Sequence, residues 1–255
     1  MLRFFRSGFI LLRGKVGFTL ETREKKRGDR FDGYWLRDEV PAMNQFMAYL
    51  FPNRADNEAF IEQSIDLRPM DAFLAKKNAG LEKDKYSYFH VILAACVKCF
   101  VLRPRMNRFI SGNRIYQRDH ISVAFVVKKR FEDSSSEGLA YKRYTGDDTI
   151  DTLHASILEE IYQCRRTDVE DNSNAFMQKL MRLPSWLLRL VVKILFKLDR
   201  KGKVPYDLIR TDPNYASIFL TNLGSIGLDA GYHHLNNWGT NSFFGVIGKK
   251  HLAPE

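Results

Sequence analysis

Cysteine is scarce in this sequence, which has 3 in 255 residues. A small odd number in a chain of this length excludes a disulfide scaffold and indicates a reducing compartment, so we expect a cytoplasmic protein. Cys96 and Cys99 form a C-x-x-C pattern inside the apolar segment 89–102, with no second Cys or His pair nearby. Thiolate chemistry needs exposure and a positive neighbourhood, so the pattern favours a buried helix over a redox or metal site. We expect no bound metal.

Long hydrophobic runs are also lacking. Residues 1–15 are apolar and basic, but their longest uninterrupted apolar run is "FILL", which is too short for a transmembrane helix, and no cleavage pattern follows it. An amphipathic surface anchor, a targeting leader and a misplaced start codon remain alternatives. We expect residues 1–40 to be an N-terminal extension outside the core.

Acidic residues are the minority, and the net charge of +10 is unevenly placed. Residues 1–30 carry nine Lys or Arg against three acids, and residues 179–205 carry eight against one. The rest of the chain is therefore slightly acidic. Because the basic residues alternate with aliphatic ones and match no nucleic-acid motif, a nucleic-acid partner is disfavoured.

The hydrophobic content of 45% provides a real core from about residue 40 onward. Segment 64–67 is typical of a short strand. Segment 68–80 predicts a helix, with Pro69 in its first turn and Gly80 just past its end. Segment 86–102 is apolar nearly all round and predicts a helix buried on most sides that ends before Pro104.

In the segments that follow, hydrophobic residues recur at every second position, as in strands. Ser111-Gly112-Asn113 is hairpin chemistry, and 121–127 and 139–145 read as strands of one sheet. Segment 147–164 predicts an amphipathic helix with four aliphatic residues on one face: Ile150, Leu153, Ile157 and Ile161. Strands near 215–221 and 242–247 complete the pattern. This order predicts an α/β two-layer sandwich and argues against a doubly wound parallel sheet.

Segment 183–203 has a basic stripe on an otherwise apolar helix. Arg189, Lys193 and Lys197 recur every four residues. About fifteen residues at ~1.5 Å each are shorter than the ~30 Å hydrocarbon core, so this helix cannot cross a bilayer alone. Two interpretations remain: a helix lying on a membrane or a partner, and a helix packed on its own domain with snorkelling lysines.

Two stretches together resemble a known family. Segment 90–129 is similar to the helix, hairpin and strand of the acyltransferase catalytic domain of 2-oxo acid dehydrogenase complexes, whose fold is shared with chloramphenicol acetyltransferase. "SIFLTNLGSIG", followed by a loop and "SFFGVIGKK", resembles the second diagnostic stretch of that family. The resemblance covers roughly residues 45–255 and implies one acyltransferase-like domain over 41–255, with a basic amphipathic insertion near 176–205.

The resemblance implies transfer of an acyl group between coenzyme A and a thiol, amine or alcohol, in a homotrimer with active sites between subunits. In this family a histidine is the general base and a hydroxyl at a strand end donates to the oxyanion. Thr221 matches that hydroxyl, and Asn222 and Gly224 match the rest of the motif, which implies a substrate-binding role. A Thr-Asn turn that only ends a strand is the alternative. Arg54 resembles an arginine that pairs with an aspartate of the catalytic segment, with an offset of one residue.

The sequence departs from the family at its end. The family carries its base in a His-x-x-x-Asp-Gly motif, and none of the 6 histidines here has that context. His233 and His234 lie in a loop where the family has no base, so a packing or surface role is expected for them. We therefore expect the C-terminal strand and helix of the fold to be missing, and the chain to be incomplete. Residues 1–40 are also too short for a lipoyl-bearing module, so no covalently bound lipoyl group is expected.

Two functions are compatible with these observations. One is an acyl-CoA-dependent acyltransferase. The other is a non-catalytic relative that acts as a membrane-associated binding or scaffold protein, in contact with a membrane surface through 184–203 and the N-terminus. In the second case the cytoplasmic protein is peripheral at a membrane.

Overall fold

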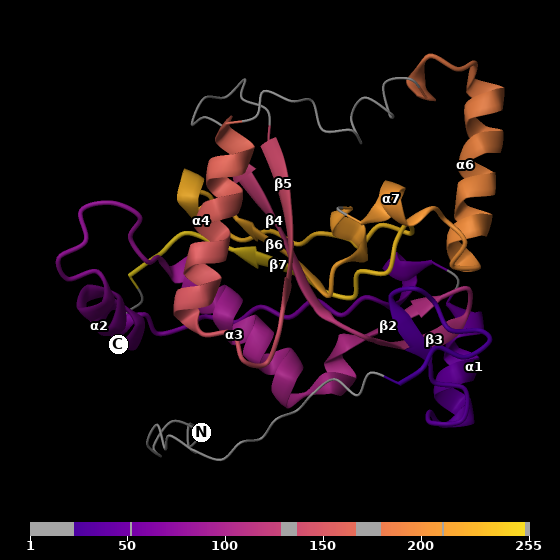
Figure 1. Ribbon diagram of the computed structural model, residues 1–255, viewed down its shortest axis with the longest axis horizontal. Coiled ribbons are helices and arrows are strands. Elements are labelled where there is room, and N and C mark those ends of the chain that lie inside the picture. The colour runs from indigo at the N-terminus through magenta and orange to yellow at the C-terminus, as the bar shows by residue number, and fades with distance from the viewer. Residues whose placement is uncertain (1–22, 52, 129–136, 167–179, 211, 253–255) are drawn as a thin grey trace.

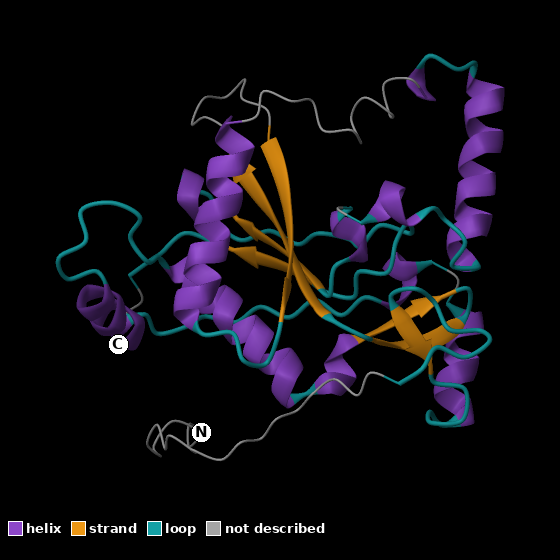
Figure 2. Ribbon diagram, viewed as in Figure 1, coloured by secondary structure: helices purple, strands orange, loops and turns teal. Residues whose placement is uncertain are grey.

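The computed structural model describes residues 23–51, 53–128, 137–166, 180–210 and 212–252, and Figures 1 and 2 show how its elements are arranged. The strands are β1 (Gly33–Trp35), β2 (Arg108–Ser111), β3 (Arg114–Arg118), β4 (Ile121–Lys128), β5 (Glu137–Tyr144), β6 (Ile218–Asn222) and β7 (Phe244–Ile247). The helices are α1 (Ala42–Leu50), α2 (Arg68–Lys77), α3 (Tyr88–Leu102), α4 (Ile150–Arg166), α6 (Ser185–Arg200) and α7 (Tyr206–Ile209), and the short 3-10 helix η4 (Leu223–Ile226) follows β6.

The larger sheet has the strand order β5-β4-β6-β7. β5 pairs antiparallel with β4, whereas β4, β6 and β7 run parallel to one another. Because antiparallel and parallel pairs occur side by side, the sheet is mixed and is not a doubly wound parallel sheet. The α/β class predicted from the sequence is confirmed. The predicted loss of a C-terminal strand and helix stays a prediction.

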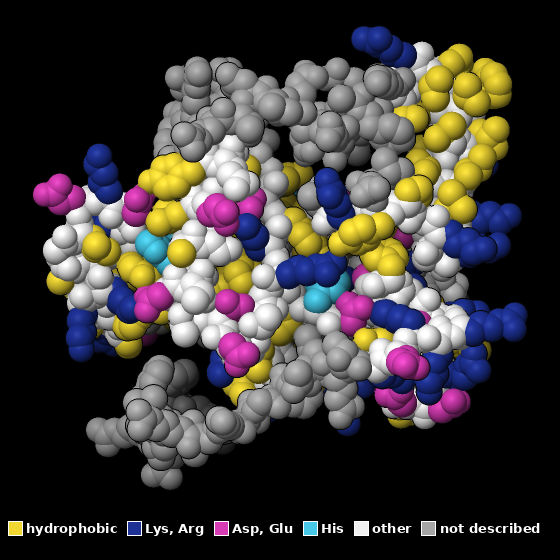
Figure 3. Space-filling model, viewed as in Figure 1, with side chains coloured by type: hydrophobic (Ala, Val, Ile, Leu, Met, Phe, Trp, Pro, Cys, Tyr) yellow, Lys and Arg dark blue, Asp and Glu magenta, His cyan; other side chains and the backbone are white. Residues whose placement is uncertain are grey.

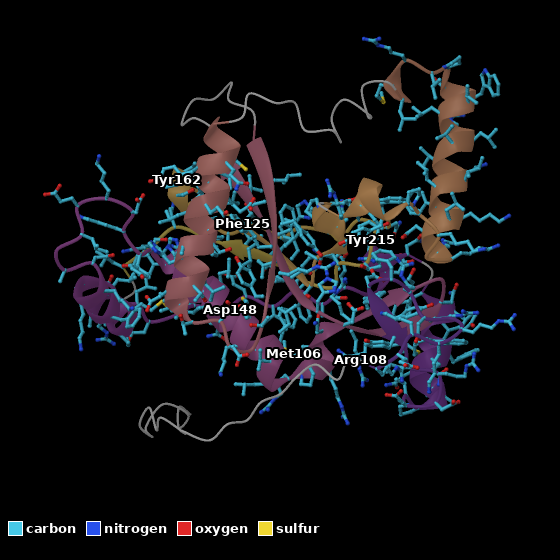
Figure 4. The ribbon with its side chains drawn as sticks, in the orientation of Figure 1. Met106, Arg108, Phe125, Asp148, Tyr162 and Tyr215 are labelled. Carbon is cyan, nitrogen blue, oxygen red and sulfur yellow. The ribbon has the colours of Figure 1, made fainter. Side chains whose placement is uncertain are left out.

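The main core lies between this sheet and the helices α3 and α4, which cover the same face (Figure 2). Side chains alternate between the two faces of a strand, so every second residue of β4 points to the helices. One of them is Phe125, labelled in Figure 4. Leu93 of α3 and Leu153 of α4 meet this face and are almost fully buried. The amphipathic helix predicted over 147–164 is thereby confirmed.

The smaller sheet has the order β1-β3-β2. Its β2–β3 turn is formed by Gly112 and Asn113, both with positive φ (55° and 63°), as a two-residue hairpin turn requires. The predicted hairpin is confirmed. A Cβ atom at Gly112 would lie 2.5 Å from the carbonyl oxygen of Arg200, so the absence of a side chain lets the end of α6 approach the turn.

Part of the N-terminal region belongs to the core. The expectation that residues 1–40 lie outside it is wrong for residues 30–40, because β1 pairs with β3 and both Tyr34 and Leu36 are buried. Arg30 and Asp32 are buried as well, and their side chains form an ion pair of 2.9 Å. The proposed anchor or leader in residues 1–22 lies outside the described residues.

Two helix and strand predictions need correction. Residues 64–67 form no strand, because no neighbouring strand pairs with them within the described chain. α3 forms as predicted, and Pro104 follows it, but it is buried on only one face. Cys99 is exposed, although the sequence predicted burial on most sides, because no other described element covers that side of the helix.

α6 extends away from the rest of the structure (Figure 1). Among the described residues, only its carboxyl end packs on the domain: Leu198 joins the small cluster of Val204, Ile209 and Tyr215, and Asp199 is buried. The alternative of a helix packed on its own domain is therefore wrong for most of its length. None of the described helices has the length and apolar content needed to cross a bilayer.

A buried polar network anchors that end of the helix. The Arg30 guanidinium donates to the backbone carbonyl of Asp199 and lies 3.3 Å from its carboxylate. The hydroxyl of Tyr215, labelled in Figure 4, donates to the same carboxylate over 2.7 Å. Burial, reinforced by the Asp199 charge, raises the pKa of Tyr215, so the hydroxyl keeps its proton.

Candidate functional site

Thr221 and Asn222 end the central strand β6 and point to opposite faces of the sheet. Ile218 and Leu220 face the core beneath α3 and α4, and Asn222 continues that side. Thr221 therefore lies on the other face, beside Val246 of β7. Its side chain is half-buried, and no group within the described ranges hydrogen-bonds to its hydroxyl. Among the described residues, nothing therefore occupies this hydroxyl, and it can donate to a ligand.

Asn222 and Gly224 build the turn that follows the strand. The Asn222 side chain accepts a hydrogen bond from the Ser225 backbone N–H over 3.2 Å, and the Ser225 hydroxyl donates to the Asn222 carbonyl over 2.7 Å. A Cβ atom at Gly224 would lie 2.5 Å from the carbonyl oxygen of Gly248. The motif thus fixes the ends of β6 and β7 side by side. The substrate-binding role expected for both residues stays a prediction.

A cleft of about 2250 Å³ opens at the β7 edge of the sheet. Its walls include Ile92 and Cys96 of α3 on one side of the sheet, and Phe244 and Val246 of β7. Asn222, Gly224 and Arg54 also line it, whereas the Thr221 side chain does not. Since Val246 is the neighbour of Thr221, the cleft reaches the strand directly beside the hydroxyl.

An aromatic stack lies on the same face as Thr221. Phe219 precedes Thr221 by two residues and packs edge-on against Phe244, with 4.9 Å between ring centroids. The imidazole of His233 in turn lies parallel to the Phe244 ring, with centroids 4.0 Å apart. From the sequence we expected a packing or surface role for His233 in this loop, and its ring packs on Phe244 of the sheet.

Arg54 binds backbone carbonyls. Its guanidinium donates to the carbonyl oxygens of Gly239 and Asn241, and its backbone N–H donates to the Asn237 side chain over 2.9 Å. Burial lowers the pKa of Arg54 to about 10, so the side chain remains charged near neutral pH. No carboxylate within the described ranges forms an ion pair with Arg54. The ion pair stays a prediction.

In the C-x-x-C pattern, Cys96 is shielded and Cys99 is exposed. Burial, with the neighbouring Cys99, raises the pKa of Cys96 to about 11, which keeps the thiol protonated and unreactive near pH 7. Across the described residues, no cluster of three or more His, Cys, Asp or Glu side chains is arranged to hold a metal ion.

One pair near the cleft was missed by sequence reasoning. The Glu58 carboxylate accepts a hydrogen bond from the Leu235 backbone N–H over 2.6 Å and lies 2.7 Å from Nδ1 of His234. Glu58 is nearly buried, whereas His234 is exposed. The two side chains are 176 positions apart, and no local pattern connects them. The pair fixes the loop that carries His233.

No family model and no curated protein matches this sequence. Solved structures with a similar arrangement are acyltransferase cores of 2-oxoacid dehydrogenase complexes. The dihydrolipoamide acetyltransferase of Azotobacter vinelandii is 16% identical, with 88% of this chain and 72% of that chain covered and a TM-score of 0.45. The catalytic core from Thermoplasma acidophilum is 10% identical, with 82% and 78% covered and a TM-score of 0.48. With TM-scores below 0.5, these likenesses establish neither the activity nor the site of this chain.

Proposed function

We propose that this protein is an acyltransferase that moves an acyl group between coenzyme A and a thiol, amine or alcohol. The observation that carries the proposal is the Thr221 hydroxyl, which stands unpaired within the described chain at the end of a central strand, next to a large cleft. The resemblance of the motifs around residues 90–129 and 218–227 supports the same activity.

The chemistry needs a donor at this place. The acceptor attacks the thioester carbonyl, and the carbonyl oxygen becomes an oxyanion in the tetrahedral intermediate. Thr221 donates a hydrogen bond to that oxygen. The C–S bond then breaks, and coenzyme A leaves as a thiol with the proton that the acceptor gave up. A fixed donor at a developing oxyanion contributes about 100- to 1000-fold to the rate.

The cleft is the proposed binding site of acyl-CoA. Its volume of about 2250 Å³ exceeds that of most sites for small ligands, roughly 300–1000 Å³, which suits the long pantetheine arm and a nucleotide. Asn222 and Gly224 line it, and we propose that the exposed Lys249 and Lys250 exchange their carboxylate partners, Asp229 and Asp71, for phosphate groups. No metal and no covalently bound lipoyl group enter this proposal.

The general base is proposed to come from outside the described residues. His233 is engaged in ring packing, and we assign it no proton transfer. In the proposed active form, a homotrimer, a neighbouring subunit faces Thr221, and Arg54 pairs with an aspartate of the base-carrying segment. The mass of the native particle, measured by light scattering, tests the trimer.

The experiment offers acyl-CoA and a panel of thiols, amines and alcohols to the native full-length protein and follows release of free coenzyme A. Thr221→Ser is expected to keep transfer. Thr221→Val, which has nearly the same shape, is expected to lower kcat roughly 100-fold or more without weakening acyl-CoA binding. Equal transfer rates for the two variants would show that the Thr221 hydroxyl does not stabilise the oxyanion.

A folded protein that binds acyl-CoA but transfers nothing to any acceptor would instead support the non-catalytic binding protein. A protein that neither binds nor transfers would overturn the proposal.

A further inference from the structure

α6 exposes an unusual amount of apolar surface for a helix in water. Trp186 is 69% exposed, and Leu190 and Ile194 are each 49% exposed. Figure 3 shows hydrophobic side chains along the length of this helix. Contiguous apolar surface of this kind marks an interaction site, because single exposed apolar residues are common but rows of them are not.

The polar side of α6 carries charge of one sign. Arg189, Lys193 and Lys197 form a stripe, and all three are exposed. The acidic residue of the helix, Asp199, is buried and paired with Arg30. All the exposed charge on α6 is therefore positive. The exposed apolar residues Trp186 and Leu190 lie directly beside the stripe.

The position of the helix makes this surface accessible. The network of Arg30, Asp199 and Tyr215 holds the carboxyl end, while the amino-terminal turns extend beyond the sheets (Figure 1). Because α6 is held at one end, most of its surface is accessible to a binding partner.

We propose that α6 binds the surface of a membrane that contains anionic lipids, lying in the interface with its apolar residues among the acyl chains. The lysine and arginine side chains extend to the lipid headgroups. The 16 residues of α6 span about 24 Å, less than the ~30 Å hydrocarbon core, so the helix lies on the membrane and does not cross it.

Charge complementarity favours this occupant over a second copy of the same helix. Two α6 helices packed side by side would bring their cationic stripes together with no exposed carboxylate to neutralise them. An anionic headgroup layer supplies the missing negative charge along the entire stripe. The proposal concerns binding alone and does not depend on acyl transfer.

The test is flotation of the native protein with phosphatidylcholine vesicles at about physiological salt. One set of vesicles contains 30% phosphatidylserine and the other contains none. Binding is expected only with phosphatidylserine and is expected to weaken as salt is raised. The triple variant Arg189→Glu/Lys193→Glu/Lys197→Glu is expected to lower the vesicle partition coefficient roughly 100-fold or more. Its control, Lys76→Glu/Lys98→Glu/Arg105→Glu, reverses three exposed charges elsewhere and is expected to retain binding.

A second variant separates the apolar contribution. Leu190→Ser/Ile194→Ser keeps every charge and is expected to lose most vesicle binding, while the far-UV circular dichroism shows that the fold is intact. Trp186 fluorescence is expected to shift to the blue on vesicles, and the Trp186→Phe variant identifies its signal. Absence of binding by the folded protein at low salt, or equal binding to neutral vesicles, would overturn the proposal. Self-association abolished by Leu190→Ser/Ile194→Ser, without vesicle binding, would assign the surface to a second copy instead.

Discussion

The imidazole ring of His233 lies flat on the ring of Phe244, with 4.0 Å between centroids and 5° between planes. The stack lies on the sheet face that carries Thr221, and the flat face of the imidazole packs on the Phe244 ring. We therefore expect His233→Phe to keep both stability and acyl transfer, and His233→Ala to cost about 1 kcal/mol of unfolding free energy. Urea unfolding and coenzyme A release measure the two effects. A large loss of transfer with a stable His233→Phe variant would make this histidine the general base.

Gly224 is held against the backbone of Gly248. A Cβ atom there would meet the carbonyl oxygen at 2.5 Å, and the neighbouring atoms are also backbone, which cannot move aside cheaply. Gly224→Ala is expected to lower the unfolding free energy by about 1–3 kcal/mol. Gly231→Ala is the matched control, since a Cβ there meets no atom within 4 Å. Similar urea midpoints for the two variants would show that the β6–β7 contact is looser than described.

His90 is expected to make stability depend on pH. Burial, with the nearby His154 ring, lowers the pKa of His90 to about 4 from its ordinary 6.5, and its Nδ1 accepts a hydrogen bond from the Ser87 N–H. Between these two values the unfolded chain binds a proton that the folded chain does not, so stability falls as the pH falls from 6.5 towards 4. The expected loss is roughly 2 kcal/mol.

The measurement compares urea unfolding at pH 7 and pH 4.5. The His90→Gln variant keeps an acceptor for the Ser87 N–H, as a capping box requires, but has no proton to bind. Its stability is expected to fall less over this interval, since all other titrating groups are shared. Equal pH dependence in both proteins would show that His90 is protonated freely in the folded state.

Asp199 is expected to be much more sensitive to loss of its charge than an exposed acid such as Asp229. Asp199→Asn removes the charge that pairs with Arg30 and leaves that guanidinium with less compensation in a buried site. Loss of one partner of a buried pair costs about 3–5 kcal/mol. The exposed Asp229, which pairs with Lys249 at the surface, is the control, and Asp229→Asn is expected to change the unfolding free energy by less than about 1 kcal/mol. Thermal or urea midpoints that do not separate the two variants would contradict this assignment.

Local sequence patterns predicted the elements whose causes are local. The spacing of Leu153 and Ile157 predicted the buried face of α4, and the Gly112-Asn113 pair predicted the hairpin. The end of β6 at Asn222 also follows the sequence. In each case the signal and its consequence lie within a few residues, where periodicity and turn chemistry act.

The sequence-based predictions that were wrong concern contacts between residues far apart in the chain. Residues 30–40 were placed outside the core because nothing in their composition announces that β1 pairs with β3, or that Arg30 reaches Asp199, 169 positions away. Segment 64–67 has the composition of a strand but finds no strand to pair with among the described elements. Of the candidate site, the sequence predicted that Thr221 ends a strand. It did not predict which face of the sheet Thr221 takes, because that depends on how β6 is inserted between β4 and β7.

The anchoring of α6 at its carboxyl end alone has a consequence for how this chain tolerates change in length. Insertion or removal of whole turns near its amino-terminal end would alter how far the helix reaches without disturbing Asp199 or the residues that hold it. The same alteration between Asp199 and Val204 would rotate the helix out of the network and expose the small cluster beneath it. The length of α6 can therefore change without loss of its attachment, while the direction in which the helix points is fixed by its last turn.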